Sequence, residues 1–220
     1  MRTAAVASVL GAALVLAAAA PAAFDPKEPQ QRHTAADTRL AKSLALKQSD
    51  LASGWRVDRS KDTSPPCSVE PDESNLVQTA RIDPTFTWRD GLTNLGSEVD
   101  IFRTSAQSRT DWRLSTLALM KACVLEAARS GVGKGVQVTI VSAERLPAPH
   151  VAERNLHYRI VFAVHGKQTV PIVVDLVALG RGRTTVVLHA LTVDRPLPAA
   201  VEKTLVGILG ARLTAGRGVV

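Results

Sequence analysis

Aromatic side chains and cysteines are scarce in this chain of 220 residues: aromatic residues make up 4% of the sequence, and there are two cysteines. Lysine and arginine outnumber the acidic residues and give a net charge of +7, but they are scattered along the chain. Nucleic-acid surfaces usually combine clustered positive charge with aromatic stacking platforms. We therefore expect no nucleic-acid partner, and an anionic polymer matches the moderate positive charge better.

The sequence also lacks the short motifs of common catalytic chemistry. It has no His-x-His or His-Glu-x-x-His metal pattern and no Gly-x-Ser-x-Gly nucleophile elbow. Residues 131–135 (GVGKG) resemble a phosphate-binding loop, but no Ser or Thr follows Lys134 and a predicted helix precedes the segment, so we interpret it as a helix-ending loop. We expect no enzymatic activity, no cofactor and no metal. A hydrolase of unrecognised type is the remote alternative.

Long apolar runs are absent except at the N-terminus. Residues 4–20 are mostly apolar, follow Arg2, and lead to Ala20-Pro21-Ala22, which places small residues at positions −3 and −1 of a cut after Ala22. This is the pattern of a secretory signal peptide. A cysteine near the cut would indicate a lipid anchor, and the sequence has none there. We predict a signal peptide over 1–22 and no membrane span after its cleavage. The mature chain is then secreted or associated with the cell envelope.

The two cysteines, Cys67 and Cys123, are expected to form a disulfide, because an exported protein reaches an oxidising compartment. In the chain-entropy model a loop of this length stabilises the fold by about 4 kcal/mol. Cys67 lies in a proline-containing loop and Cys123 in a predicted helix. A reactive thiol pair is the alternative, but the Cys-x-x-Cys spacing is absent.

The remaining residues suffice for one domain. We interpret 23–36 as a flexible tether, 37–213 as the domain and 214–220 as a tail. Capping-box patterns at Thr34 and Thr104 predict helices that run to Leu46 and Gly131, and a third helix follows the prolines near 196–198. Strands are predicted near 80–88, 96–103, 136–145, 155–165, 168–179 and 183–193. This order indicates an α+β fold in which helices sandwich an antiparallel sheet of about five to six strands.

Tryptophan and glycine mark the loops. In residues 49–55 (SDLASGW), Gly54 is expected to take unusual dihedral angles at a corner, and Trp55 to pack on the core. Trp88 and Trp112 are interpreted as packing or edge residues, with exposed sugar-stacking platforms as the alternative.

The last four strands predict two different sheet faces. With three-residue loops at 165–167 and 180–182, one face is apolar and should carry the long helix. It is formed by Tyr158, Ile160, Ile172, Val174, Leu176, Val186, Leu188 and Ala190. On the other face, His157, Arg159, Asp175 and His189 converge on a mostly apolar wall. These four residues are our candidate ligand-binding site, because small-molecule sites combine apolar surface with few polar groups.

Other interpretations of the same four residues stay open. A solvated or helix-covered face with an ordinary ion pair has the same residue pattern. A one-residue slip in register would separate the four side chains. The two histidines and Asp175 are also potential metal ligands or a catalytic base, although no motif supports that use.

Several segments together resemble a known actinobacterial family, and the high Ala, Arg and Val content is typical of a GC-rich genome. They are the corner at 49–55, the loop at Pro66-Cys67, a Val-x-Ile-Phe strand at 99–102, a helix bearing Cys123, and a terminal meander with a final helix. The chain resembles, over 37–213, the extracellular sensor-type domains of PknH-like kinases and related secreted proteins, which have a PsbP-like α/β sandwich.

The resemblance implies a non-catalytic domain with a cleft on the sheet for a small or glycan-like ligand of the envelope. The kinase-linked domains typically have two disulfides, whereas this chain has cysteines for one. The alternative function is adhesion, in which a basic surface including Arg181 and Arg183 binds anionic envelope polymers or a protein partner.

Overall fold

The structure, a computed structural model, describes residues 26–60, 67–132 and 135–216. The predicted signal peptide, Pro66 and the centre of the 131–135 loop lie outside the described residues. No helix in the described ranges is long and apolar enough to cross a membrane. The domain boundaries drawn from the sequence stay a prediction.

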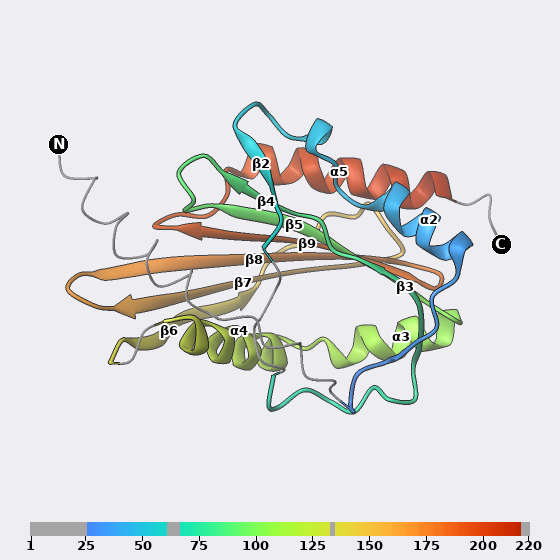
Figure 1. Ribbon diagram of the computed structural model, residues 1–220, viewed down its shortest axis with the longest axis horizontal. Coiled ribbons are helices and arrows are strands. Elements are labelled where there is room, and N and C mark those ends of the chain that lie inside the picture. Colours follow the sequence, from blue (N-terminus) through green and yellow to red (C-terminus); the bar gives the residue numbers. More distant parts are fainter. Residues whose placement is uncertain (1–25, 61–66, 133–134, 217–220) are drawn as a thin grey trace.

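Nine strands in the described part of the chain form one sheet, in the order β1-β3-β5-β9-β8-β7-β6, with β4 also paired to β5 and β2 to β4 (Figure 1). The strands are β1 Gln30–Gln31, β2 Trp55–Asp58, β3 Val77–Ile82, β4 Thr85–Trp88, β5 Asn94–Phe102, β6 Gln137–Arg145, β7 Arg154–His165, β8 Thr169–Arg181 and β9 Thr184–Val193. All pairs are antiparallel except the short β1 with β3.

The α+β class is confirmed, but the sheet has more strands than predicted. The predicted strand near 80–88 is two strands, β3 and β4, separated by Asp83 and Pro84. Proline has no backbone N–H to donate to a strand ladder, which favours a break there. The strands β1 and β2, of two and four residues, are too short to show a period in the sequence.

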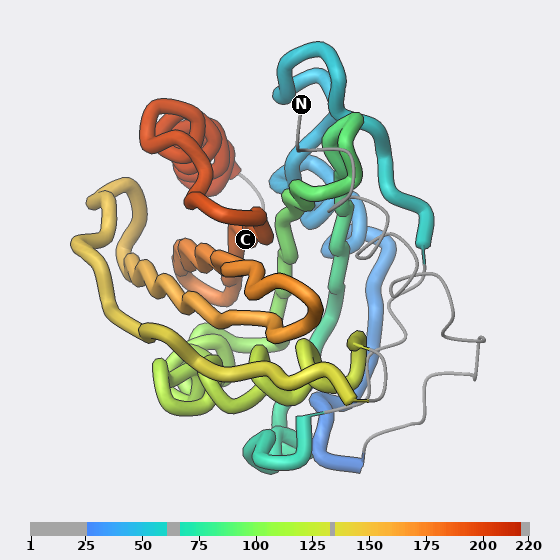
Figure 2. Tube along the Cα trace, turned by 90° about the vertical axis from the view of Figure 1, so that its left-hand side faces the viewer, coloured from blue at the N-terminus to red at the C-terminus, as the bar shows by residue number. Residues whose placement is uncertain are grey.

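The helices cover both faces of the sheet. They are α2 Ala35–Leu44, α3 Ser105–Leu114, α4 Leu117–Gly131 and α5 Ala199–Ala215, with a short 3₁₀ turn, η1, at Gln48–Asp50. In Figure 1, α2 and α5 lie on one face and α3 and α4 on the other. Figure 2, at right angles, shows α5 and α4 on opposite sides of strands β7 and β8. The helices therefore sandwich the sheet, as predicted.

Threonine caps begin three of the helices. The hydroxyls of Thr34 and Thr104 accept hydrogen bonds from the backbone N–H three residues later, which confirms both predicted starts. The predicted long helix is wrong in one respect: it breaks at Ser115, and Thr116 caps a separate helix, α4. Serine and threonine favour caps over helix interiors because their side chains bond the local backbone.

The hydrophobic core has two parts, one on each side of the sheet. The larger lies between the sheet and α2 and α5, and includes Leu44, Leu95, Val177, Leu188 and Leu209. The smaller lies beneath α4 and is built on Ile160, Phe162, Ile172 and Val174. Three of them, Ile160, Ile172 and Val174, belong to the face that we expected to carry the long helix.

The β8–β9 hairpin differs from the prediction. Arg181 pairs with Thr184, so the loop has two residues, and Gly182 takes a left-handed backbone with φ of 51°. Two-residue hairpin loops need positive φ, which glycine adopts without strain. Relative to a three-residue loop at 180–182, this register moves every side chain of β9 to the opposite face. Leu188 and Ala190 therefore join the core beneath α5 rather than the face under α4.

The predicted disulfide between Cys67 and Cys123 is present. It joins the segment before β3 to the middle of α4. Beside it, the backbone N–H and the hydroxyl of Ser68 both donate to a carboxylate oxygen of Glu126, each at 2.9 Å. The loop is thus attached to the helix by a covalent bond and by hydrogen bonds.

Candidate functional site

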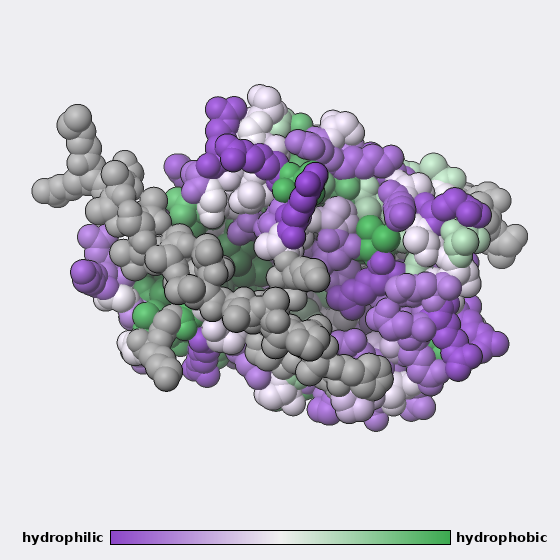
Figure 3. Space-filling model, in the orientation of Figure 1, coloured by the Kyte–Doolittle hydropathy of each residue, from purple (hydrophilic) through white to green (hydrophobic). Residues whose placement is uncertain are grey.

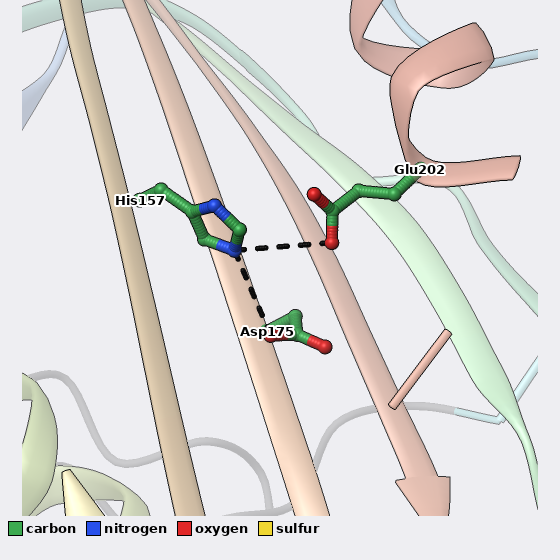
Figure 4. A group of neighbouring side chains, drawn as sticks. All are labelled: His157, Asp175 and Glu202. Carbon is green, nitrogen blue, oxygen red and sulfur yellow. Dashed lines mark ion pairs between the residues drawn. The ribbon is translucent and has the colours of Figure 1, made fainter. Parts of the chain in front are cut away.

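Three of the four predicted site residues meet beneath α5. His157 and Arg159 of β7 share a face with Asp175 of β8, and Arg159 lies directly opposite Asp175. Arg159 Nε donates to Asp175 Oδ1 at 2.6 Å, and His157 Nε2 is 3.6 Å from the same oxygen. The first turn of α5 adds Glu202, whose Oε2 lies 3.8 Å from His157 Nε2 (Figure 4). We call these four residues the polar cluster.

The polar cluster is buried at its centre. His157 is 5% exposed and Asp175 is 3% exposed. His157 Nε2 and Asp175 Oδ2 have no hydrogen-bond partner among the described residues. Burial favours a raised pKa for Asp175, but its contacts with His157 and Arg159 outweigh burial and hold that pKa below its usual value. Burial, assisted by the charge of Asp175, raises the pKa of Glu202.

The inclusion of His189 in this site is wrong. The two-residue β8–β9 loop pairs Asp175 with Ala190, so His189 points to the opposite face. There its Nε2 is 3.9 Å from Asp83 Oδ1, and its ring covers Gly96, where an added Cβ would lie 2.0 Å from that nitrogen. Glu202 is not among the residues predicted for this site, because its sole signal in the sequence is an acidic side chain in the first turn of the last helix.

The sheet face around the polar cluster is covered by helices. Residues of α2 and α5 pack on it as the larger core, so the face is not an open cleft. This agrees with the helix-covered alternative raised from the sequence. Ligand binding by His157, Arg159 and Asp175 stays a prediction, and the side chains of His157 and Asp175 are buried.

A cavity of about 810 Å³ lies on the other side of the first turns of α5. Its walls come from the corner between η1 and β2, from β4 and the loop after it, and from the segment between β9 and α5. Trp55 and Trp88 line it, with ring centroids 5.3 Å apart and planes at 66°. Val201 and Thr204 of α5 also line it, but no member of the polar cluster does. We call it the tryptophan cavity.

Gly54 leaves space for the Trp88 ring, which with Trp55 lines the tryptophan cavity. It has φ of 114°, and an added Cβ would lie 2.7 Å from Trp88 Cη2. Trp55 and Trp88 are directly paired across β2 and β4. The expectation of an unusual backbone at this corner is confirmed, and its consequence is that the two indoles lie side by side.

A second cavity, of about 350 Å³, is lined by three arginines: Arg109 and Arg113 of α3, and Arg154 of β7. The Arg154 guanidinium lies 5.3 Å from the centroid of the Trp112 ring and donates to the Ser108 hydroxyl at 2.9 Å. Hydrophilic side chains gather at the end of the molecule where α3 lies (Figures 1 and 3). We call this the arginine cavity.

The two arginines named from the sequence for adhesion are ion-paired instead. Arg183 binds the carboxylate of Asp37 through both terminal nitrogens, and Arg181 Nε lies 3.4 Å from Glu153 Oε1. Their charges are therefore offset by acidic neighbours.

Comparison with known proteins finds no matching family model and no matching curated protein. Among solved structures, the extracellular domain of PknH from Mycobacterium tuberculosis matches 80% of this chain and 96% of its own, with 12% identity and a TM-score of 0.50. The chain has the PknH sensor-domain fold. PsbP (CyanoP) from Synechocystis sp. PCC 6803 matches 76% of this chain and 86% of its own, with 14% identity and a TM-score of 0.39.

The resemblance stated from the sequence is thus confirmed at the level of the fold. Membership of a particular actinobacterial family stays a prediction, because an identity of 12% shows shared architecture alone.

Proposed function

We propose that this protein is an extracellular, non-catalytic binding protein that takes a small or glycan-like envelope ligand in the tryptophan cavity. The observation that carries the proposal is the cavity itself: about 810 Å³, lined by two indoles and by apolar residues of the β9–α5 segment. Small-molecule sites have volumes of about 300–1,000 Å³ and apolar walls with few polar groups.

The wall offers both kinds of contact that such a ligand needs. Indole rings at Trp55 and Trp88 present flat apolar surface to a sugar ring or an aliphatic chain. Thr192 also lines the cavity and is 5% exposed, and its hydroxyl has no hydrogen-bond partner among the described residues. Because an unpaired buried hydroxyl is costly, a ligand hydroxyl or carbonyl that bonds Thr192 would gain affinity there.

The disulfide supports an extracellular location, because such bonds persist in oxidising compartments. The fold shared with a kinase extracellular domain is consistent with this location. A secreted, envelope-associated protein that binds rather than transforms its ligand fits these observations.

A blocking variant tests the proposal. Ala200 is exposed on α5 and lines the tryptophan cavity, so Ala200→Phe should place an aromatic ring in it and obstruct a ligand without disturbing the core. Envelope glycans and amphiphiles titrated into the wild type should change its tryptophan fluorescence, and Ala200→Phe should lose that response. Trp112→Phe, which alters the arginine cavity, is the matched control and should keep it. Equal responses from wild type and Ala200→Phe would remove the cavity as the site.

The arginine cavity supports a second candidate function, the binding of anionic groups of an envelope polymer. Three guanidinium groups converge on one cavity, and Arg109 and Arg113 are exposed. Retention on an immobilised polyanion should fall steeply with salt and fall further in Arg109→Gln/Arg113→Gln. Arg129→Gln, an exposed site at the end of α4, is the control. Equal retention of the double variant and the control would refute this function.

A further inference from the structure

The centre of the polar cluster has the composition of a metal site. His157, Asp175 and Glu202 come from β7, β8 and α5 and bring an imidazole nitrogen and two carboxylates together. One potential ligand atom from each lies within 4.8 Å of the other two. In Figure 4 the three side chains point toward one another from three separate elements.

The spacing suits a single ion. Ligand atoms about 2.1 Å from a tetrahedral zinc ion lie about 3.4 Å from one another. His157 Nε2 is 3.6 Å from Asp175 Oδ1 and 3.8 Å from Glu202 Oε2. Both distances exceed hydrogen-bond length, so the imidazole faces the carboxylates across a gap of the right width.

Burial supplies independent support. His157 and Asp175 are more than nine-tenths buried, yet His157 Nε2 and Asp175 Oδ2 have no hydrogen-bond partner among the described residues. Buried polar atoms are normally paired. An ion between the three side chains would bind the unpaired imidazole nitrogen of His157.

The local charge also favours a cation. The polar cluster contains two carboxylates and one guanidinium, that of Arg159, so it carries one net negative charge when both carboxylates are ionised and His157 is neutral. Buried charge is costly unless it is balanced. A bound divalent ion would change the net charge of the cluster from negative to positive. Arg159, which donates to Asp175 Oδ1, would then orient that carboxylate toward the ion.

We propose that His157, Asp175 and Glu202 bind one divalent transition-metal ion, and that zinc is the best match. An imidazole combined with carboxylates is typical of first-row transition metals rather than of magnesium or calcium, which prefer oxygen ligands alone. The ion ties the first turn of α5 to the sheet. This proposal differs from the sequence expectation of no metal, because Glu202 approaches His157 only when α5 packs on the sheet.

The test is metal binding to the folded, chelator-stripped mature chain. Calorimetric titration with zinc should reveal a site with one ion per chain, and zinc should raise the unfolding temperature more than magnesium or calcium does. Glu202→Gln should lower the zinc affinity at least tenfold while keeping the helix, because glutamine is an equally good helix former. Glu144→Gln, on the exposed end of β6, should bind zinc like the wild type.

Two outcomes would overturn the proposal. One is a folded wild type that binds no zinc at millimolar concentration. The other is undiminished zinc affinity in both Glu202→Gln and His157→Gln, each checked for a native circular dichroism spectrum, because the ion would then lie elsewhere. The zinc titration involves no organic ligand, so its result does not depend on whether the tryptophan cavity binds one. Likewise, a failure to bind zinc would leave the proposed function of the tryptophan cavity untouched.

Discussion

The ion pair between Asp37 of α2 and Arg183 of the β8–β9 loop holds the hairpin that sets the register of β9. Arg183 Nη1 donates to Asp37 Oδ2 at 2.9 Å and to the Phe102 carbonyl at 3.2 Å, and Nη2 donates to Asp37 Oδ1. The Asp37 side chain is 9% exposed, whereas that of Arg183 is 34% exposed. The pair is thus buried on one side.

The cost of breaking this pair lies between two limits. Removing one partner of a fully buried pair costs about 3–5 kcal/mol, and an exposed pair contributes about 0–1 kcal/mol. Since the Arg183 side chain is 34% exposed, we expect Arg183→Met to cost about 2–3 kcal/mol, between the two limits. At about 2–4 °C per kcal/mol for a chain of this size, the unfolding temperature should fall by about 4–12 °C.

A double-mutant cycle in urea isolates the pair from other effects of the substitutions. Asp37→Asn, Arg183→Met and the double variant should give a coupling free energy of about 1–2 kcal/mol. Arg129→Met, at an exposed position near the end of α4, is the control and should change stability far less. A coupling below about 0.5 kcal/mol would refute the role assigned to the pair.

The same pair predicts the acid response. The hydrogen bond from Arg183 lowers the pKa of Asp37, although burial opposes it. A carboxylate with a depressed folded-state pKa adds stability above its unfolded pKa, near 4, and loses it as the pH falls through the folded value. Arg183→Met should therefore flatten the loss of stability below about pH 4. An unchanged acid slope would contradict this assignment.

Replacing both cysteines by serine should lower the free energy of unfolding by up to about 4 kcal/mol, measured in urea; no change would exclude a stabilising disulfide. Gly54→Ala should cost about 2–3 kcal/mol and shift the tryptophan emission, because its Cβ meets Trp88 at a positive φ; a neutral effect would contradict the close approach. Arg212→Ala removes hydrogen bonds to Asp50 and to the Ala45 carbonyl, so amide exchange should accelerate at the end of α5, and unchanged exchange would show that these bonds do not hold the helix.

Local signals in the sequence predict the elements well. Thr34 and Thr104 mark helix starts because their hydroxyls satisfy backbone donors within three residues. The meander strands are found within a few residues of their bounds because each alternates or is continuously apolar between turn residues. The disulfide needed only two cysteines and an export signal.

Pairing across the hairpins is harder to predict. A loop of two rather than three residues at Gly182 turns every side chain of β9 to the opposite face of the sheet. The local sequence pattern does not distinguish the two loop lengths, because both faces of β9 are largely apolar. His189 was placed with Asp175 for this reason. In the observed register Leu188 and Ala190 pack in the larger core, and Arg183 reaches Asp37, far away in sequence.

Contacts between distant elements were not predictable at all. Glu202 approaches His157 because α5 packs on the larger core with Glu202 on the side of the helix that faces β7. The rotation of α5 about its own axis depends on many apolar contacts. The tryptophan cavity likewise needs the pairing of β2 with β4, and β2 is too short to show a pattern. The candidate sites therefore emerge from packing rather than from motifs.

Native mass spectrometry of the mature protein, recovered from the culture medium of cells that produce it naturally, tests the central claim most directly. The wild type should carry a discrete species heavier than a metal ion that leaves on denaturation, and Ala200→Phe, recovered in the same way, should lack it. A wild type without such a species, or a blocked variant that carries the same one, would contradict ligand binding in the tryptophan cavity.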